Sequence, residues 1–163
     1  MSSSFQIVEA DLSLPEHQQA VRDLTAAYAL DPMGNGGPLP AESLERLIPA
    51  LRAHPTTHIL LAYLDGRPVG IATCFVGFST FAARPLLNLH DIAVLPECRG
   101  RGVSRELLRA VDEKARALRC CRVTLEVLEG NTRAKGIYEQ AGFAQASAGG
   151  PAGGALFFSK EVV

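Results

Sequence analysis

Long apolar runs are missing from this 163-residue sequence, and none approaches the roughly 18 residues that a membrane-crossing helix needs. The N-terminus also lacks the basic and apolar regions of a secretion signal, so we expect a cytoplasmic protein. None of the four cysteines has C-x-x-C spacing, and adjacent Cys120 and Cys121 suit neither an ordinary disulfide nor a zinc site. We interpret the cysteines as small buried hydrophobic residues and expect no bound metal.

Excess charge is also missing, since the formal net charge is −1. Residues 99–135 nevertheless contain ten Lys/Arg and five Asp/Glu, a balance of +5, which leaves six basic and twelve acidic residues elsewhere. This basic stretch indicates an anionic ligand, although a solvated charged helix explains part of it. Because the chain as a whole is not basic, we expect no nucleic-acid partner and no membrane partner.

Length and composition predict one globular domain over residues 1–163, with 47% hydrophobic and 20% charged residues. Helical periodicity predicts helices over residues 15–30, 41–53, 102–118 and 132–141. Strand patterns cover residues 5–9, 57–64, 67–78, 86–95, 121–128, 143–146 and 155–162, with a low-complexity loop at 146–155.

The resulting order is β-α-α-β-β-β-α-β-α-β-β. Asp65-Gly66 predicts an antiparallel hairpin between its flanking strands. The β-α-β unit over residues 86–128 requires a crossover, so its two strands should be parallel. The sequence therefore predicts an α/β (α+β) fold with a mixed central sheet and helices on both faces.

The most informative segment joins the strand at 86–95 to the helix at 102–118. Gly100 and Gly102 permit a tight turn, and the helix start leaves N–H groups for an anion. Arginines add positive charge, at positions 99, 101 and 105. A P-loop is excluded because no G-K-[ST] follows, and a dinucleotide fingerprint is excluded because Arg105 stands where its third glycine belongs. On these residues alone, a plain turn with solvated arginines is as good an explanation as a ligand site.

The wider pattern resembles the pyrophosphate loop of the GCN5-related N-acetyltransferase (GNAT) family, [QR]-x-x-G-x-[GA] after a strand ending in hydrophobic-x-Val-x-Pro. This chain has Ile92-x-Val94-x-Pro96, then Arg99-x-x-Gly102-x-Ser104, with serine replacing the usual Gly or Ala. The resemblance implies the GNAT fold and acetyl-CoA as cosubstrate. The implied cofactor-binding residues are Ile92, Ala93, Val94, Arg99, Gly100, Arg101, Gly102, Val103, Ser104, Arg105, Asn131 and Tyr138.

A second motif, Leu125-Glu126-Val127-x-x-x-Asn131-x-x-Ala134-x-x-x-Tyr138-x-x-x-Gly142-Phe143, is most similar to that of the bacterial ribosomal-protein N-terminal acetyltransferases. By that resemblance Glu126 is the general base, Asn131 contacts coenzyme A and Tyr138 is the general acid. A base would deprotonate the acceptor amine, and a phenol could protonate the departing thiolate. Backbone N–H groups around Ile92–Val94 could stabilise the tetrahedral intermediate where two parallel strands splay apart.

Each assignment has an alternative. Glu126 also fits the polar side of a half-buried strand, and Tyr138 fits an ordinary core aromatic. Asn131 suits a helix N-cap, a role compatible with cofactor contact. His90 and Asp91, beside the cofactor strand, are rival bases.

These patterns predict an acetyl-CoA-dependent N-acetyltransferase that uses direct attack by a primary amine. The alternative is a catalytically silent acetyl-CoA-binding module. The acceptor is not readable from the sequence, and a homodimer stays open.

Overall fold

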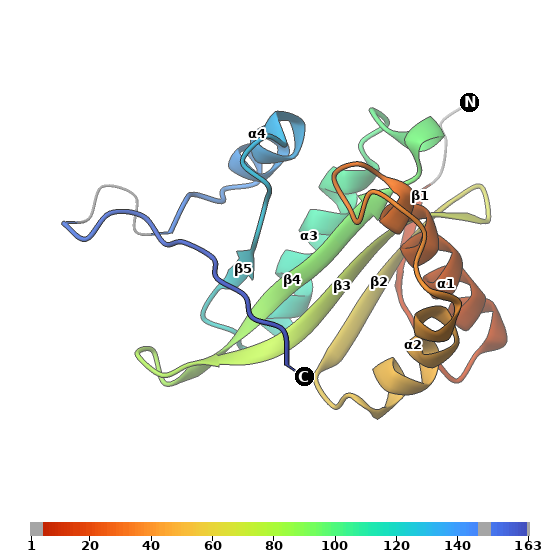
Figure 1. Cartoon of the computed structure of the whole chain (residues 1–163), viewed down its shortest axis with the longest axis horizontal. Coiled ribbons are helices and arrows are strands. Elements are labelled where there is room, and N and C mark those ends of the chain that lie inside the picture. The colour runs from red at the N-terminus through yellow and green to blue at the C-terminus, as the bar shows by residue number, and fades with distance from the viewer. Residues whose placement is uncertain (1–4, 147–150, 163) are drawn as a thin grey trace. The chain divides into compact units, whose positions relative to one another are not determined.

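The computed structural model describes residues 5–146 and 151–162 of the chain. The chain divides into two compact units, Met1–Leu128 and Glu129–Val163. The first holds five strands, three α-helices and one short 3₁₀ helix in its described part (Figure 1). In chain order they are β1 (Phe5–Glu9), α1 (Pro15–Leu30), α2 (Ala41–Ala53), β2 (Thr57–Leu64), β3 (Arg67–Ser79), β4 (Arg84–Val94), η1 (Pro96–Cys98), α3 (Val103–Ala117) and β5 (Val123–Leu125). The second unit contains α4 (Thr132–Gln140).

The sheet follows the order β1-β2-β3-β4-β5. The first four strands are antiparallel neighbours, whereas β4 and β5 are parallel, as the crossover through α3 requires. Asp65 and Gly66 form the β2–β3 turn with φ of 50° and 79°, the conformation that a tight hairpin demands. The predicted mixed sheet and its strand directions are confirmed.

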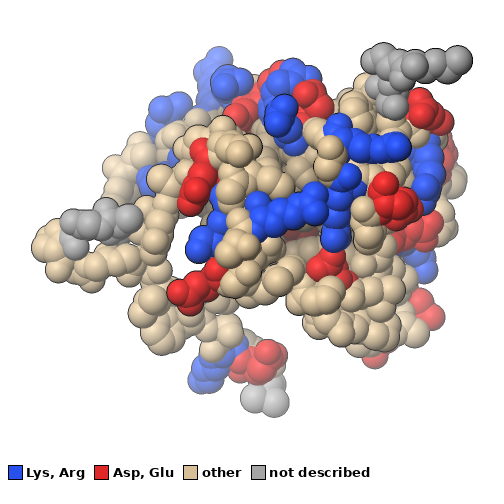
Figure 2. Space-filling model, turned by 90° about the horizontal axis from the view of Figure 1, so that it is seen from above, with Lys and Arg blue, Asp and Glu red and all other residues tan. Residues whose placement is uncertain are grey.

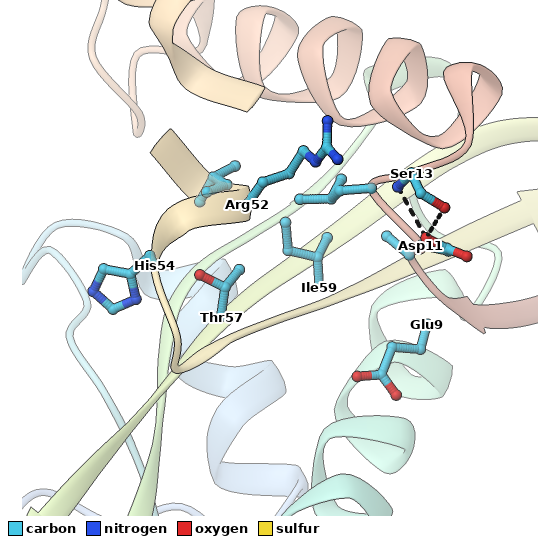
Figure 3. Close-up of a pocket in the computed structure, with 10 residues that line it drawn as sticks. Glu9, Asp11, Ser13, Arg52, His54, Thr57 and Ile59 are labelled. Carbon is cyan, nitrogen blue, oxygen red and sulfur yellow. Dashed lines mark hydrogen bonds between the residues drawn. The ribbon is translucent and has the colours of Figure 1, made fainter. Parts of the chain in front are cut away.

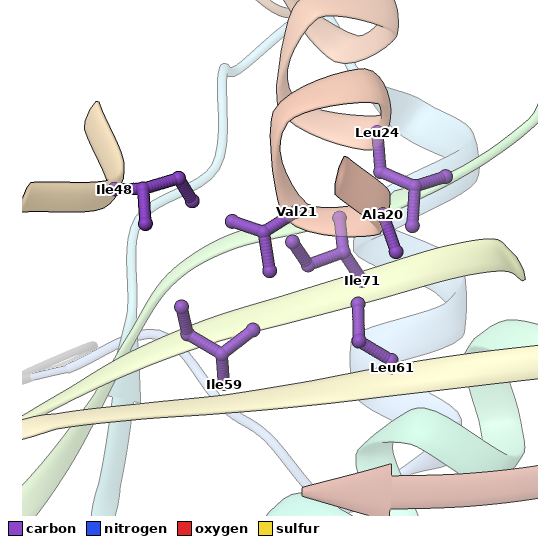
Figure 4. Packing of buried hydrophobic residues seen from close by; sticks show 7 residues of the cluster. All are labelled: Ala20, Val21, Leu24, Ile48, Ile59, Leu61 and Ile71. Carbon is purple, nitrogen blue, oxygen red and sulfur yellow. The ribbon is translucent and has the colours of Figure 1, made fainter. Parts of the chain in front are cut away.

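Helices cover both faces of the sheet. On one face, α1 and α2 pack on alternate residues of β2 and β3 in a buried cluster (Figure 4) of Ala20, Val21, Leu24, Ile48, Ile59, Leu61 and Ile71. Gly70 precedes Ile71 on β3 and so faces the other way. A Cβ at Gly70 would lie 3.1 Å from side-chain atoms of both Val103 and Leu107, which places α3 on that second face.

The β3–β4 ladder contains one irregularity, and it lies on β4 just before residues 92–94. Asp91 pairs with Thr73 and Leu89 pairs with Cys74, so His90 is an extra residue on β4. Such a bulge turns successive side chains toward the same face and bends the strand.

The two terminal strands predicted over residues 143–146 and 155–162 are not formed, and this part of the prediction is wrong. A single backbone hydrogen bond, from Ala155 N to Ala146 O at 3.5 Å, joins the two segments, and residues 147–150 of their connecting loop lie outside the described residues. The flanking sequence is rich in alanine and glycine, which favour strands poorly. An apolar segment forms a strand only where the edge of another strand is available for backbone hydrogen bonds.

The strand predicted over residues 121–128 is shorter than expected, because β5 contains only Val123–Leu125. Its pairing with β4 ends at Leu89–Leu125. Glu126 therefore follows β5 rather than belonging to it.

Candidate functional site

The loop between η1 and α3 has the geometry expected for anion binding. Gly100 and Gly102 have φ of 77° and 88°, and a Cβ built on either meets no atom within 4 Å. The first i→i−4 hydrogen bond of α3 runs from Glu106 N to Gly102 O at 3.1 Å. The N–H groups of residues 103–105 thus have no acceptor within the helix, and the positive end of the helix dipole adds to their attraction for an anion.

The predicted loop residues contribute in different ways. Val103 is 2% exposed, so its side chain belongs to the core beside Gly70, and only its backbone N–H is available to a ligand. The side chains of Arg101 and Arg105 are exposed, and Ser104 is half-buried at the start of α3. Basic side chains are interspersed with acidic ones when the molecule is viewed from above (Figure 2).

Arg99 is already engaged in the structure. Its Nε donates to Val94 O at 3.1 Å, and its Nη2 donates to Asp31 Oδ2 at 2.5 Å. No sequence pattern indicated that Asp31, 68 residues away, would be its partner. Only the tertiary fold brings these two residues together.

A second ion pair joins η1 to the β2–β3 hairpin. Arg67 Nη2 donates to Glu97 Oε1 at 2.7 Å. Hydrogen bonding by backbone and by Arg67 lowers the pKa of the exposed Glu97 carboxyl. Cys98, beside it, is buried at 4% exposure and anchors η1 in the core.

The end of β4 is the candidate position for the reacting carbonyl. Pairing with β5 covers only residues 87–89, so residues 90–94 extend beyond the described parallel ladder. Ile92, Ala93 and Val94 lie on this stretch, as the sequence predicted for backbone donors, while their other edge pairs with β3.

The bulge gives Asp91 an unusual environment. Burial raises the pKa of the Asp91 carboxyl, and the charge of neighbouring His90 opposes this rise. Burial first, and then the charges of Asp91 and Asp31, raise the pKa of the Tyr28 phenol on α1. Among the described residues, the Asp91 carboxylate has no ion-pair partner within salt-bridge distance.

Glu126, the base implied by the resemblance, is exposed beyond the end of β5. In the second unit, Asn131 is the N-cap of α4, and its Oδ1 accepts from Ala134 N at 3.2 Å. The Tyr138 ring packs edge-on against Phe143, with centroids 6.0 Å apart. The predicted N-cap role of Asn131 is therefore confirmed, and its contact with coenzyme A stays a prediction.

A separate cavity of about 470 Å³ lies where β1 and α2 end and β2 begins (Figure 3). Its polar lining includes Glu9, Asp11, Arg52 and His54. The His54 ring contacts Phe75 with centroids 5.0 Å apart, and Phe75 contacts His90 at 5.6 Å. This row of rings connects the cavity with the bulge.

Within residues 5–146 and 151–162, no helix is both long and apolar enough to cross a membrane. The same residues contain no group of three or more His, Cys, Asp or Glu placed to hold a metal ion.

Comparison with known proteins agrees with this architecture. The chain is 32% identical over 96 residues to the thialysine N-epsilon-acetyltransferase of Bos taurus and 34% identical over 108 residues to that of Sus scrofa. These alignments cover 54% and 57% of this chain, and 56% and 62% of the relatives' lengths. The chain therefore spans about three-fifths of the curated relatives that it matches.

Solved structures match over nearly the whole chain. A probable acetyltransferase superposes with a TM-score of 0.79 at 25% identity, covering 96% of this chain and 99% of the other. An aminoglycoside N-acetyltransferase in complex with CoA has a TM-score of 0.75 at 20% identity, covering 99% and 98%. The model of the acetyltransferase (GNAT) family matches residues 20–143, most of the chain, so this protein belongs to that family.

Proposed function

We propose that the chain is an acetyl-CoA-dependent N-acetyltransferase that transfers the acetyl group to a primary amine. The observation that carries this proposal is the open N-terminus of α3 behind Gly100 and Gly102, in a member of the GNAT family. Its unpaired N–H groups suit the pyrophosphate of coenzyme A, and the exposed Arg101 and Arg105 add positive charge. The CoA complex of a structural neighbour agrees with this choice of cosubstrate.

The proposed chemistry is direct attack in a ternary complex. The amine nitrogen bonds to the thioester carbonyl carbon, and N–H groups around Ile92–Val94 stabilise the resulting oxyanion. The intermediate then loses its carbon–sulfur bond, and Tyr138 protonates the departing thiolate. A base takes one proton from the amine, so the overall reaction converts an amine and a thioester into an amide and a thiol.

Two carboxylates are candidates for that base. Glu126 follows from the resemblance, and its exposure after β5 leaves it accessible to water. Asp91 has the more suitable environment, since burial raises its pKa toward the range in which a carboxylate removes protons effectively. We therefore propose Asp91 as a second candidate base beside Glu126.

We propose a small basic amine as the acceptor, such as a basic amino acid or an aminoglycoside-like molecule. The relatives and the CoA-bound neighbour carry the names of enzymes for acceptors of this kind. Asp91 is half-buried and has no salt-bridge partner in the described part of the chain, so its carboxylate would attract such a cation.

The test has two stages. Mass spectrometry of the purified protein should detect coenzyme A, and a panel of basic amines should release thiol from acetyl-CoA. Asp91→Asn and Glu126→Gln are then compared, and loss of the true base should lower activity at neutral pH by about 10²-fold or more. Binding of coenzyme A with no thiol release from any amine would instead indicate a silent acetyl-CoA-binding module.

A further inference from the structure

Asp31 occupies a junction between two loops. It is the C-cap of α1, and its Oδ1 accepts from Met33 N at 2.8 Å. Its backbone carbonyl accepts from Gly34 N at 2.8 Å and Gly36 N at 3.1 Å. One residue thus organises the turn that follows α1.

The second carboxylate oxygen of Asp31 is directed at Arg99. The Asp31 side chain is 15% exposed and that of Arg99 is 36% exposed, so water screens the pair only in part. The hydrogen bond from Arg99, followed by that from Met33 N, lowers the pKa of the Asp31 carboxyl. The Asp31 carboxylate is therefore charged at neutral pH.

This ion pair restrains Arg99, the first residue of the candidate phosphate loop (residues 99–104). The Arg99 guanidinium spans from Val94 O, at the end of β4, to Asp31, at the end of α1. Arg99 immediately precedes Gly100, and the two glycines of positive φ give the loop little stiffness of its own. A loop held in its binding conformation loses less entropy when a ligand arrives.

We propose that Asp31 is a positioning residue for acetyl-CoA, acting through Arg99 to hold the backbone of the phosphate loop ready for the pyrophosphate. This inference rests on the proposed function. It assigns the Arg99 side chain to the support of the loop and leaves contact with the pyrophosphate to the backbone N–H groups.

Whether coenzyme A binds more weakly or more tightly after removal of the Asp31 charge distinguishes a positioning role from simple charge repulsion. A carboxylate near a bound polyanion repels it, so removing that charge alone should tighten binding. Removal would also tighten binding if Asp31 merely withheld Arg99 from the phosphates. Only a positioning role predicts that the loss of a negative charge weakens the binding of an anion.

Asp31→Asn isolates the interaction. Asparagine keeps an oxygen for Met33 N, so the turn after α1 is retained, while the ion pair with Arg99 is lost. Asp23→Asn is the matched control, because it removes the same charge from an exposed position of α1, at a residue that accepts its hydrogen bond from Gln19. Calorimetric titration with coenzyme A should show affinity about 3- to 10-fold weaker for Asp31→Asn and unchanged for Asp23→Asn.

A double-mutant cycle tests whether Asp31 acts through Arg99. Asp31→Asn combined with Arg99→Gln should bind coenzyme A no more weakly than Arg99→Gln alone, because the interaction is already absent. Asp31→Glu, which keeps the charge, should bind more tightly than Asp31→Asn. In steady-state kinetics, the loss in Asp31→Asn should fall on KM for acetyl-CoA more than on kcat.

Unchanged or tighter binding in Asp31→Asn would overturn the inference, as would additive losses in the double variant. A wild-type protein that does not bind coenzyme A would refute the proposed function itself. Binding by wild type together with normal binding by Asp31→Asn would refute the positioning role alone.

Discussion

The Gly102→Ala variant distinguishes the contribution of Gly102 to folding stability from its contribution to coenzyme A binding. Gly102 has φ of 88° and ψ of 3°, a left-handed conformation that costs an L-residue about 1–2 kcal/mol. A Cβ at this position meets no atom within 4 Å, so steric repulsion adds nothing in the ligand-free protein. The expected loss of unfolding free energy is therefore about 1–2 kcal/mol, which corresponds to roughly 2–8 °C in Tm for a chain of this size.

Gly66→Ala supplies the matched control. Gly66 has φ of 79° and the same open surroundings, but it lies in the β2–β3 turn. Both variants should lose similar stability by differential scanning calorimetry. If pyrophosphate lies against the backbone at Gly102, the new methyl group occupies ligand space, and only Gly102→Ala should also bind coenzyme A at least about tenfold more weakly, roughly 1.4 kcal/mol.

The binding comparison is made by calorimetric titration at a temperature where both variants are folded. Equal coenzyme A affinities for Gly102→Ala and Gly66→Ala would refute the placement of the phosphate at this glycine. Equal affinities with a smaller stability loss at Gly102 would also show that the helix N-terminus relaxes to relieve the strain.

The remaining predictions concern one proposed catalytic group and one ion-pair cluster. Tyr138→Phe should lower kcat by about 10²–10⁴-fold with little change in coenzyme A binding, and normal kcat on a substrate whose chemical step limits turnover would exclude the general-acid role. Burial alone would raise the pKa of Glu9, but hydrogen bonds with His58 and Lys114 outweigh it and the net shift is downward. A lowered folded-state pKa stabilises the fold above the unfolded value of 4.5, and this contribution is lost as pH falls through the folded pKa. Glu9→Gln should therefore destabilise at pH 7 by up to about 1 kcal/mol and converge with wild type in unfolding experiments once the pH falls below the lowered folded-state pKa of Glu9, whereas a pH-independent difference would contradict this linkage.

Local sequence patterns were sufficient to predict most of the secondary structure of the first unit. The apolar spacing predicted α1 and α2 with their observed bounds, and Asp65-Gly66 predicted a turn whose two residues both have positive φ. The tight turn at Gly100 and Gly102 and the helix start that follows were also predictable, because glycine spacing and helix-start signals are properties of neighbouring residues. Phosphate binding by this turn stays a prediction. In each case the determining interactions lie within a few positions of one another in the chain.

The terminal strands and the length of β5 were not predictable in this way. A strand requires a partner edge, and pattern alone does not state whether that edge is available. Residues 155–158 are apolar enough for a strand, yet Leu156, Phe157 and Phe158 are 80%, 73% and 84% exposed. Glu126 was assigned to a strand for the same reason, although β5 ends at Leu125.

The sequence by itself determined the helices, the hairpin and the glycine turn before α3, because short-range spacing and turn chemistry specify these features. The tertiary structure alone decided the electrostatics of the site. It placed Asp31 against Arg99 across 68 residues and introduced the bulge that sets Asp91 in a half-buried environment. Burial and ion pairing depend on which distant elements pack together, so the charge state and orientation of these side chains follow from the fold and not from the local sequence.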